Sequence, residues 1–173
     1  MVSIIKTMST KNRQTGFTLV ELIVVMAILG ILAVISLANF RTSQIKARDA
    51  QRKHDLRQIT NALESYIGDH GSYPSASGGE IKACGCKAPA SADLCDWTGG
   101  GGSREMCDDN NTVYMKEVPG DPLSTETYCY WSDGNSFKVY VKLENTNDPD
   151  IIASVSCAGA SYNFGIASSN TSP

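Results

Sequence analysis

Residues 17–40 read FTLVELIVVMAILGILAVISLANF, and Glu21 carries the only charged side chain among these 24 residues. As a helix, a run of this length spans about 36 Å, enough to cross a hydrocarbon core of about 30 Å. A helix on the surface of a soluble protein has a polar face, and this run has almost none. The run therefore predicts a transmembrane helix.

Glu21 separates this run from two simpler kinds of apolar segment. A secretory signal peptide has a shorter apolar core and small residues at its cleavage site, and no such site follows the run. An ordinary membrane anchor explains the length but not the carboxylate, which costs about 2.5–3.5 kcal/mol at the centre of a membrane helix. Glu21 therefore needs a partner or a function.

A cut between Gly16 and Phe17 would supply that partner. The new α-amino group of Phe17 would be a cation four residues before Glu21. It could pair with Glu21 of its own chain or with Glu21 of a neighbouring subunit. The second pairing would couple the removal of charge from lipid to the addition of a subunit in register.

The stretch GFTLVEL at residues 16–22 resembles the prepilin peptidase recognition site of type IV pilins and type II secretion pseudopilins. Residues 1–16 resemble the leader peptide of that family. The basic side chains of this leader are Lys6, Lys11 and Arg13. The resemblance implies cleavage after Gly16, N-methylation of Phe17 and an assembly role for Glu21. It also implies an α+β, type IV pilin-like fold, in which one long N-terminal helix packs on a small antiparallel sheet.

Beyond residue 40 the sequence turns polar, but one apolar stripe continues at helical spacing. Its residues are Ile45, Leu56, Ile59, Leu63, Tyr66 and Ile67. Residues 17–69 contain no proline and predict one continuous helix. Its first part, residues 17–40, would lie in the membrane. Its second part, residues 41–69, would pack on an extracytoplasmic head of residues 70–173. Family members often have proline where this chain has Ala38, so a bend at that position is left open.

Five basic residues follow the apolar run: Arg41, Lys46, Arg48, Arg52 and Lys53. By the positive-inside rule they compete with the leader for the cytoplasmic side, and the resemblance favours the leader. We expect a solvated helix face that contacts lipid head groups. The alternative is that these residues pair with acidic residues of adjacent subunits.

All six cysteines lie between residues 84 and 157, downstream of the membrane segment, which predicts disulfides formed outside the cytoplasm. They are Cys84, Cys86, Cys95, Cys107, Cys129 and Cys157. A tetrahedral zinc site made by the first four is the alternative, but the Cys84-x-Cys86 spacing is tighter than zinc sites usually have. The residues themselves leave the connectivity open. The resemblance favours Cys129–Cys157, because pilins often carry a bridge near the C-terminus.

Residues 75–111 are rich in glycine, serine, alanine and cysteine, and we expect an irregular loop stapled by disulfides. Strand patterns follow at residues 112–118, 128–132 and 137–143, with weaker ones at 151–157 and 162–166. Asp133-Gly134 is typical of a hairpin turn. Residues 118–122, VPGDP, resemble the turn before the sheet in major pseudopilins. The head is predicted to hold three or four antiparallel strands with one face on the helix.

The loop of residues 144–150 reads ENTNDPD and offers hard oxygen ligands. Major pseudopilins of type II secretion bind calcium in a loop near the end of the sheet. The resemblance therefore implies a weak calcium site, with Asn147, Asp148 and Asp150 as its ligands. The spacing is not that of an EF-hand, and no other cofactor is expected.

No catalytic constellation is visible in the sequence. The two histidines, His54 and His70, are interpreted as surface residues, and no serine or cysteine has a readable base beside it. The first 20 residues hold three of the 15 Lys and Arg residues and none of the 18 Asp and Glu residues. The rest of the chain is therefore acidic, and we expect no broad nucleic-acid binding.

Together these features predict the structural subunit of a type IV pilus-like filament, not an enzyme. We expect a single-pass protein of the cytoplasmic (inner) membrane with its head outside, which later lies in a cell-surface or periplasmic filament. The expected partners are further copies of the chain, the prepilin peptidase, a pilus or secretion assembly platform and membrane lipid. The alternatives are a pseudopilin of a type II secretion or competence system, and a minor or tip pilin with an adhesive head.

Overall fold

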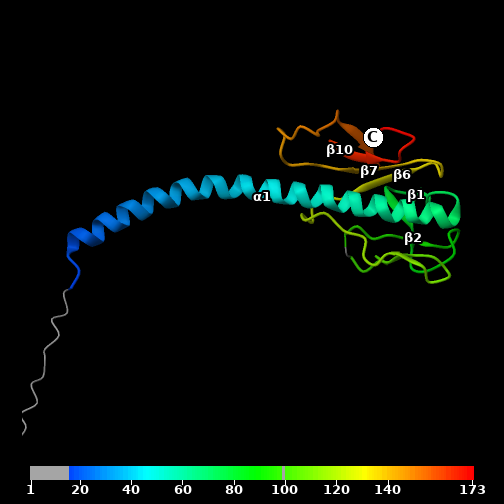
Figure 1. The fold of residues 1–173 in the computed structure, drawn as a ribbon, viewed down its shortest axis with the longest axis horizontal. Helices are drawn as coiled ribbons and strands as arrows, with labels where there is room; N and C mark the ends of the chain where they lie inside the picture. The colour runs from blue at the N-terminus through cyan, green and yellow to red at the C-terminus, as the bar shows by residue number, and fades with distance from the viewer. Residues whose placement is uncertain (1–15, 99) are drawn as a thin grey trace, which may run out of the picture. The chain divides into compact units, whose positions relative to one another are not determined.

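The computed structural model describes residues 16–98 and 100–173, without the side chains of residues 35–39. The described residues form one helix, α1 (Leu19–His70), followed by short strands (Figure 1). This confirms the predicted continuous helix, which starts at Leu19 instead of residue 17. The chain divides into two compact units between Arg41 and Thr42, within α1.

The first unit carries the apolar run. Every residue from Gly16 to Val34 is exposed, and the exposed fraction reaches 88% at Phe17 and 74% at Val34. No helix in the described part of the chain is long and apolar enough to cross a membrane. The predicted leader lies outside the described residues except for Gly16, and so does the side chain of Ala38. An isolated chain therefore leaves the described apolar side chains of this unit uncovered.

The second unit is built on the rest of α1. One face of this helix segment is buried: Leu56, Ile59, Leu63 and Tyr66 are each 2% exposed or less. These residues belong to the predicted apolar stripe, because a spacing of three or four places them on one side of a helix. They share one hydrophobic core with residues from the strands. The amphipathic interpretation of this segment is confirmed.

The main sheet consists of β6 (Cys129–Ser132), β7 (Phe137–Val141) and β10 (Phe164–Ala167), in the antiparallel order β10-β7-β6. The β6–β7 connection is the predicted hairpin, and Gly134 in it has a φ of 87°, which favours glycine. Side chains alternate across the sheet. The face toward α1 includes Tyr130, Val139 and Val141, which are buried in the core shared with the helix.

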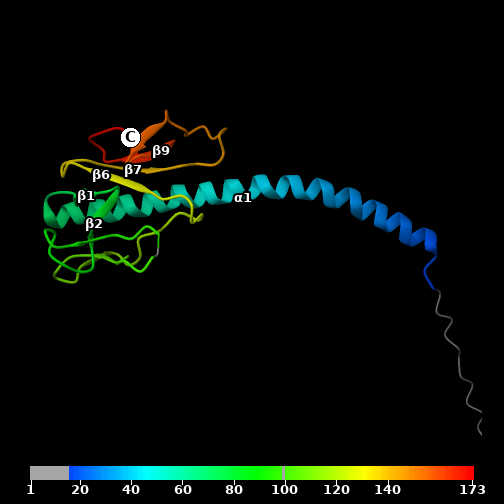
Figure 2. The same cartoon turned by 180° about the vertical axis from the view of Figure 1, so that it is seen from behind.

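A separate hairpin, β8 (Val155–Cys157) and β9 (Ala160–Tyr162), precedes β10 (Figure 2). The sequence predicted strands at residues 151–157 and 162–166, which contain parts of these elements. The weak pattern did not show that β8 pairs with β9, whereas β10 pairs with β7. Strands of three or four residues are too short for alternation to define their partners.

Residues 75–111 are not the irregular loop that we expected. They contain β1 (Ala76–Ser77), β2 (Glu80–Cys84), β3 (Asp93–Leu94) and β4 (Met106–Cys107). Together with β5 (Val113–Met115) they form a second sheet, in which β2 pairs with β1, β3 and β4. Only β2 is long enough to show alternating burial of its side chains, and it buries Ile81 and Ala83. The prediction was wrong because the other strands in this stretch have two residues each and carry no period.

Three disulfides join the six cysteines: Cys84–Cys95, Cys86–Cys107 and Cys129–Cys157. The first two staple the second sheet, because Cys84 lies in β2 and Cys107 lies in β4. The third is the pairing that the resemblance implied. No cysteine is free, so the zinc alternative for the first four cysteines is wrong.

Candidate functional site

Thr18 and Glu21 hold the start of α1 through reciprocal hydrogen bonds. The backbone N–H of Glu21 donates to Thr18 Oγ1 at 3.3 Å. The backbone N–H and the hydroxyl of Thr18 donate to Glu21 Oε2 at 3.0 and 2.9 Å. This arrangement is a capping box, which satisfies backbone donors that the first turn of a helix leaves without partners. It explains why α1 begins at Leu19.

The predicted site residues Gly16, Phe17 and Glu21 lie together at this helix start. Gly16 and Phe17 are exposed and precede the cap, so the peptide bond between them is accessible in the chain. Both hydrogen bonds recorded for the Glu21 carboxylate go to Oε2, and the described residues supply none to Oε1. Glu21 is thus oriented by its own chain while one carboxylate oxygen can accept a further donor.

Thr18 is a site residue that was not predicted from the sequence. In this uncut chain Phe17 has no free amino group, and the Thr18 N–H and hydroxyl bind Glu21 instead. The pairing of Glu21 with the amino group of Phe17 stays a prediction for the cut chain. The signal was present in the sequence, because threonine three residues before glutamate and ahead of an apolar run is typical of a capping box.

Arg52 in the second unit contradicts the prediction of a solvated basic face. Its side chain is 0% exposed. Nε and Nη2 donate to the two carboxylate oxygens of Asp121 at 2.7 and 2.8 Å. Nη1 donates to Asp49 Oδ1 at 2.8 Å and to Glu144 Oε1 at 2.6 Å. The prediction was wrong for Arg52 because two of its partners come from loops distant in sequence, which helical spacing cannot show.

Arg48 completes this group, which we name the Arg52 cluster: Arg48, Asp49, Arg52, Asp121 and Glu144. Arg48 Nε donates to Glu144 Oε1 at 2.7 Å. The Asp49 carboxylate accepts the backbone N–H groups of Glu144 and Asn145 at 3.0 and 2.8 Å. Hydrogen bonds from Arg48 and then Arg52 lower the pKa of Glu144 to about 2. The cluster therefore joins α1 to the turn at residue 121 and to the loop after β7 within a single chain.

The two histidines differ from each other. His54 is exposed, as we expected, and lies 2.6 Å from the Gln58 side-chain nitrogen. His70 is half-buried at the end of α1, where its ring lies 4.2 Å from that of Tyr66 and Nε2 lies 3.2 Å from the Tyr114 hydroxyl. The surface interpretation was wrong for His70, because packing against tyrosines from two elements cannot be read from its position at the helix end.

Residues 11–37 match the prokaryotic N-terminal methylation motif. The chain is 33% identical over 128 residues to type II secretion system core protein G of Vibrio cholerae, covering 74% of this chain and 77% of that protein. It is 34% identical over 112 residues to the Aeromonas hydrophila protein of the same name, covering 65% and 69%. The chain belongs to the type IV pilin and pseudopilin family.

A relative named as a pilin matches a shorter part of the chain. The type IV major pilin protein PilA of Myxococcus xanthus is 38% identical over 61 residues, which cover 35% of this chain and 28% of that protein. No solved structure matches this pilin-family chain significantly.

Two of the three calcium ligands implied by the family resemblance, Asp148 and Asp150, form ion pairs with Lys53. Lys53 Nζ donates to Asp148 Oδ1 and to Asp150 Oδ2, both at 2.7 Å. Hydrogen bonds from Lys53 and from the Asp150 backbone lower the pKa of Asp148. Calcium takes six to eight oxygen ligands, and here an ammonium group already lies between the two carboxylates. In this arrangement the residues do not fit a calcium ion.

One other group of side chains could have held a metal. Among the described residues, Cys86, Glu105 and Cys107 place three ligand atoms within 4.8 Å of one another. Cys86 and Cys107 are joined in a disulfide, so they do not offer thiolates.

Replacing Arg52 tests the buried cluster. We expect Arg52→Met to lower the free energy of unfolding by about 3–5 kcal/mol, because buried carboxylates lose the cation that they share. Urea denaturation of the full-length chain in detergent measures the change. Arg57→Met is the matched control, since Arg57 is exposed on the same helix and its loss should change stability by less than about 0.5 kcal/mol. If both variants changed the free energy of unfolding equally, the stabilising role of the Arg52 cluster would be contradicted.

We expect the head to become less stable at acid pH, in part because Glu144 becomes protonated. The pKa of this carboxyl is lowered from 4.5 to about 2 in the folded chain, so its contribution is present above about pH 4.5. The contribution is lost as the pH falls from about 4.5 toward 2. Melting temperatures measured from neutral pH to pH 2 should fall more gradually in this window for Glu144→Gln than for the unmodified chain. The exposed Glu117→Gln is the control and should leave the profile unchanged.

Calcium should distinguish the unmodified chain from a Lys53 variant. We expect millimolar calcium or EDTA to leave the melting temperature of the unmodified chain unchanged, because the Lys53 ammonium already lies between the two carboxylates that would bind the ion. Lys53→Met should lower the melting temperature, and millimolar calcium should restore part of the loss. Stabilisation of the unmodified chain by calcium would contradict this interpretation. Arg57→Met, on the same helix and exposed, is the control.

Proposed function

We propose that the chain is inserted in the cytoplasmic membrane as a prepilin, cut after Gly16, methylated at Phe17 and assembled into a type IV pilus-like filament. The observation that carries the proposal is the helix start. An accessible Gly16–Phe17 bond precedes a capped Glu21, and an apolar helix surface follows that its own chain leaves uncovered. Lipid covers this surface before assembly, and neighbouring subunits cover it in the filament.

Glu21 is proposed to guide the addition of subunits. Its Oε2 is held by Thr18, and its Oε1 has no hydrogen bond recorded from the described residues. The amino group of Phe17 in a neighbouring subunit can therefore donate to Oε1 without breaking the helix cap. A charge-assisted hydrogen bond of this kind is about twice as strong as a neutral one, and it is stronger still away from water. A subunit out of register would leave both charges without a partner.

The proposal makes the chain a structural subunit and not an enzyme. Its partners are further copies of the chain, the prepilin peptidase, and the platform that assembles the filament. The head would lie outside the cytoplasmic membrane, where disulfides persist.

Two filament systems remain as candidates, and one observation favours type II secretion. The relatives named as type II secretion proteins match along most of their length, whereas the match to the named pilin covers 28% of that protein. Similarity limited to the N-terminal helix would not tell a pilus subunit from a type II secretion subunit. Similarity that extends into the head therefore favours a type II secretion pseudopilin over a surface pilus subunit.

Glu21→Ala should block filament assembly without blocking processing. Mass spectrometry of the membrane fraction should show a mature chain that begins at Phe17 and carries an N-methyl group. Sheared filaments viewed by electron microscopy should be absent or reduced at least tenfold relative to the unmodified chain, roughly the effect of losing one charged hydrogen bond. Asp109→Ala, an exposed acidic residue of the head, is the control and should assemble normally.

Unchanged assembly of Glu21→Ala would contradict the pairing, and a mature chain that begins elsewhere would contradict the processing site. Deleting the gene separates the two machines. Loss of enzyme export with surface fibres intact would identify type II secretion, and the reverse result would identify a pilus.

A further inference from the structure

The face of the main sheet that points away from α1 carries polar and aromatic side chains. Cys129 and Trp131 on β6 lie opposite Tyr140 and Lys138 on β7, respectively. They alternate with Tyr130 and other residues of the buried face. Trp131 is 45% exposed, although Tyr130 next to it in β6 is buried in the core. This face is therefore not part of the core shared with the helix.

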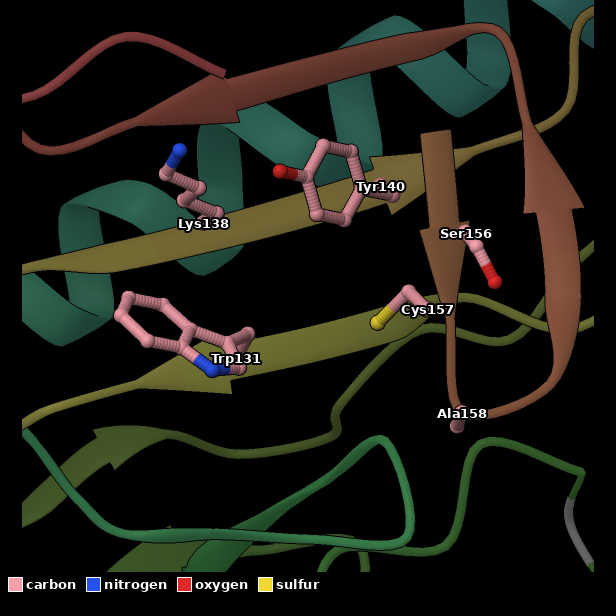
Figure 3. Close-up of a pocket in the computed structure, with 6 residues that line it drawn as sticks. All are labelled: Trp131, Lys138, Tyr140, Ser156, Cys157 and Ala158. Atoms are coloured by element: carbon pink, nitrogen blue, oxygen red, sulfur yellow. The ribbon is translucent and has the colours of Figure 1, made fainter. Parts of the chain in front are cut away.

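The β8–β9 hairpin covers one end of this face and leaves the other end open. The Cys129–Cys157 disulfide holds β8 against β6, and the rings of Tyr140 and Tyr162 stack with centroids 6.3 Å apart. A pocket of about 320 Å³ remains beside the hairpin. Its lining consists of Trp131, Lys138, Tyr140, Ser156, Cys157 and Ala158 (Figure 3).

The neighbouring strand β10 is shaped to receive the Tyr140 ring. Gly165 lies opposite Tyr140 in the β7–β10 register. A Cβ at Gly165 would come within 2.6 Å of Tyr140 Cδ1, so a larger residue would displace the ring. The glycine allows the ring to lie across the sheet, and Figure 3 shows its hydroxyl pointing toward the Lys138 side of the pocket.

Tyr140 is 5% exposed, yet no hydrogen bond is recorded for its hydroxyl within the described residues. Burial raises the pKa of this hydroxyl, which therefore stays protonated. The hydroxyls of Tyr128 and Tyr130, by contrast, donate to Asp55 and to the Pro74 carbonyl at 2.7 and 2.8 Å. The Tyr140 ring is thus largely covered, while its unbonded hydroxyl is not among the fully buried polar atoms of the described residues. A hydroxyl that is open to a pocket and has no partner in its own chain can donate to an external ligand.

Two further donors border the same pocket. Neither the Lys138 ammonium nor the Trp131 indole N–H has a hydrogen bond or an ion pair recorded among the described residues. The indole N–H of Trp97, by comparison, donates to the Gly79 carbonyl at 3.0 Å. No carboxylate lines the pocket. The pocket thus presents one positive charge and several donors in an otherwise acidic chain.

We propose that this pocket binds an acidic sugar, a carboxylated pyranose unit of a polysaccharide. The exposed indole of Trp131 offers a flat apolar surface for the face of the sugar ring. Lys138 would hold the carboxylate, and the Tyr140 hydroxyl would donate to a ring hydroxyl oxygen. The volume lies at the lower end of ligand pockets and suits one sugar unit with its neighbours in solvent. The head alone carries this inference, which does not depend on the filament that the chain builds.

Titration of the full-length chain in detergent with galacturonate oligomers tests the proposal, with uncharged galactose oligomers for comparison. Calorimetry measures affinity, and tryptophan fluorescence reports contact with Trp131. We expect the acidic oligomer to bind at least tenfold more tightly than the neutral one. Lys138→Met should abolish this preference, Trp131→Ala should abolish binding, and Tyr140→Phe should weaken it several-fold. Each variant should keep the melting temperature of the unmodified chain within a few degrees, which excludes unfolding as the cause.

Lys142→Met is the matched control, because Lys142 follows β7 and pairs with Glu126 at 3.2 Å outside the pocket. It should leave the affinity unchanged. Equal affinity for acidic and neutral oligomers would overturn the proposal, as would no binding at millimolar oligomer. Acetate that competes as well as the oligomer would show an anion site without sugar recognition, and would also overturn it.

Discussion

The buried guanidinium of Arg52 constrains how the second unit is put together. Arg52 makes four hydrogen bonds to three carboxylates, two of which lie far away in the sequence. A charge removed from water is costly unless its hydrogen-bonding groups are satisfied, so the chain must bring Asp121 and Glu144 to one point on α1. This requirement fixes which face of the helix meets the sheet and where the loops on either side of β6 and β7 are attached. Hydrophobic burial alone would allow the helix to slide by a turn, whereas the Arg52 cluster does not.

The first unit differs from the second in that its own chain does not bury its described apolar side chains. Most of its described side chains are apolar, and these are exposed with nothing in their own chain to cover them. The helix start shows how one carboxylate is accommodated there. Glu21 satisfies backbone and hydroxyl groups of Thr18 through one oxygen, so a donor from another molecule does not have to compete with the cap. In the filament that we propose, local helix stability and assembly would therefore be served by different atoms of the same side chain.

The sequence was informative where a pattern is local. The helix, its buried stripe and the Asp133-Gly134 hairpin follow from spacing within a few residues, and the structure confirms them. Thr18 belongs to the same class, since its partner is three residues away, and it was missed only because the glutamate was read as a membrane charge. The prediction failed where the partner is distant in sequence: Arg52 with Asp121, Lys53 with Asp148, and β10 with β7. The strands of two residues were not predicted for a different reason. Disulfides and neighbouring strands hold them in place, so their sequences need no alternation of polar and apolar residues.

The Cys129–Cys157 disulfide shows how stability and recognition become coupled in a head of this size. The bridge joins residues 28 positions apart, and a loop of that length contributes about 3–4 kcal/mol in the chain-entropy account. It also fixes β8 over the outer face of the sheet, which makes the hairpin one wall of the pocket beside Trp131 and Lys138. Because the disulfide already holds the β8–β9 hairpin in place, the hairpin would lose little conformational entropy when a ligand binds. A ligand could therefore bind through weak polar contacts.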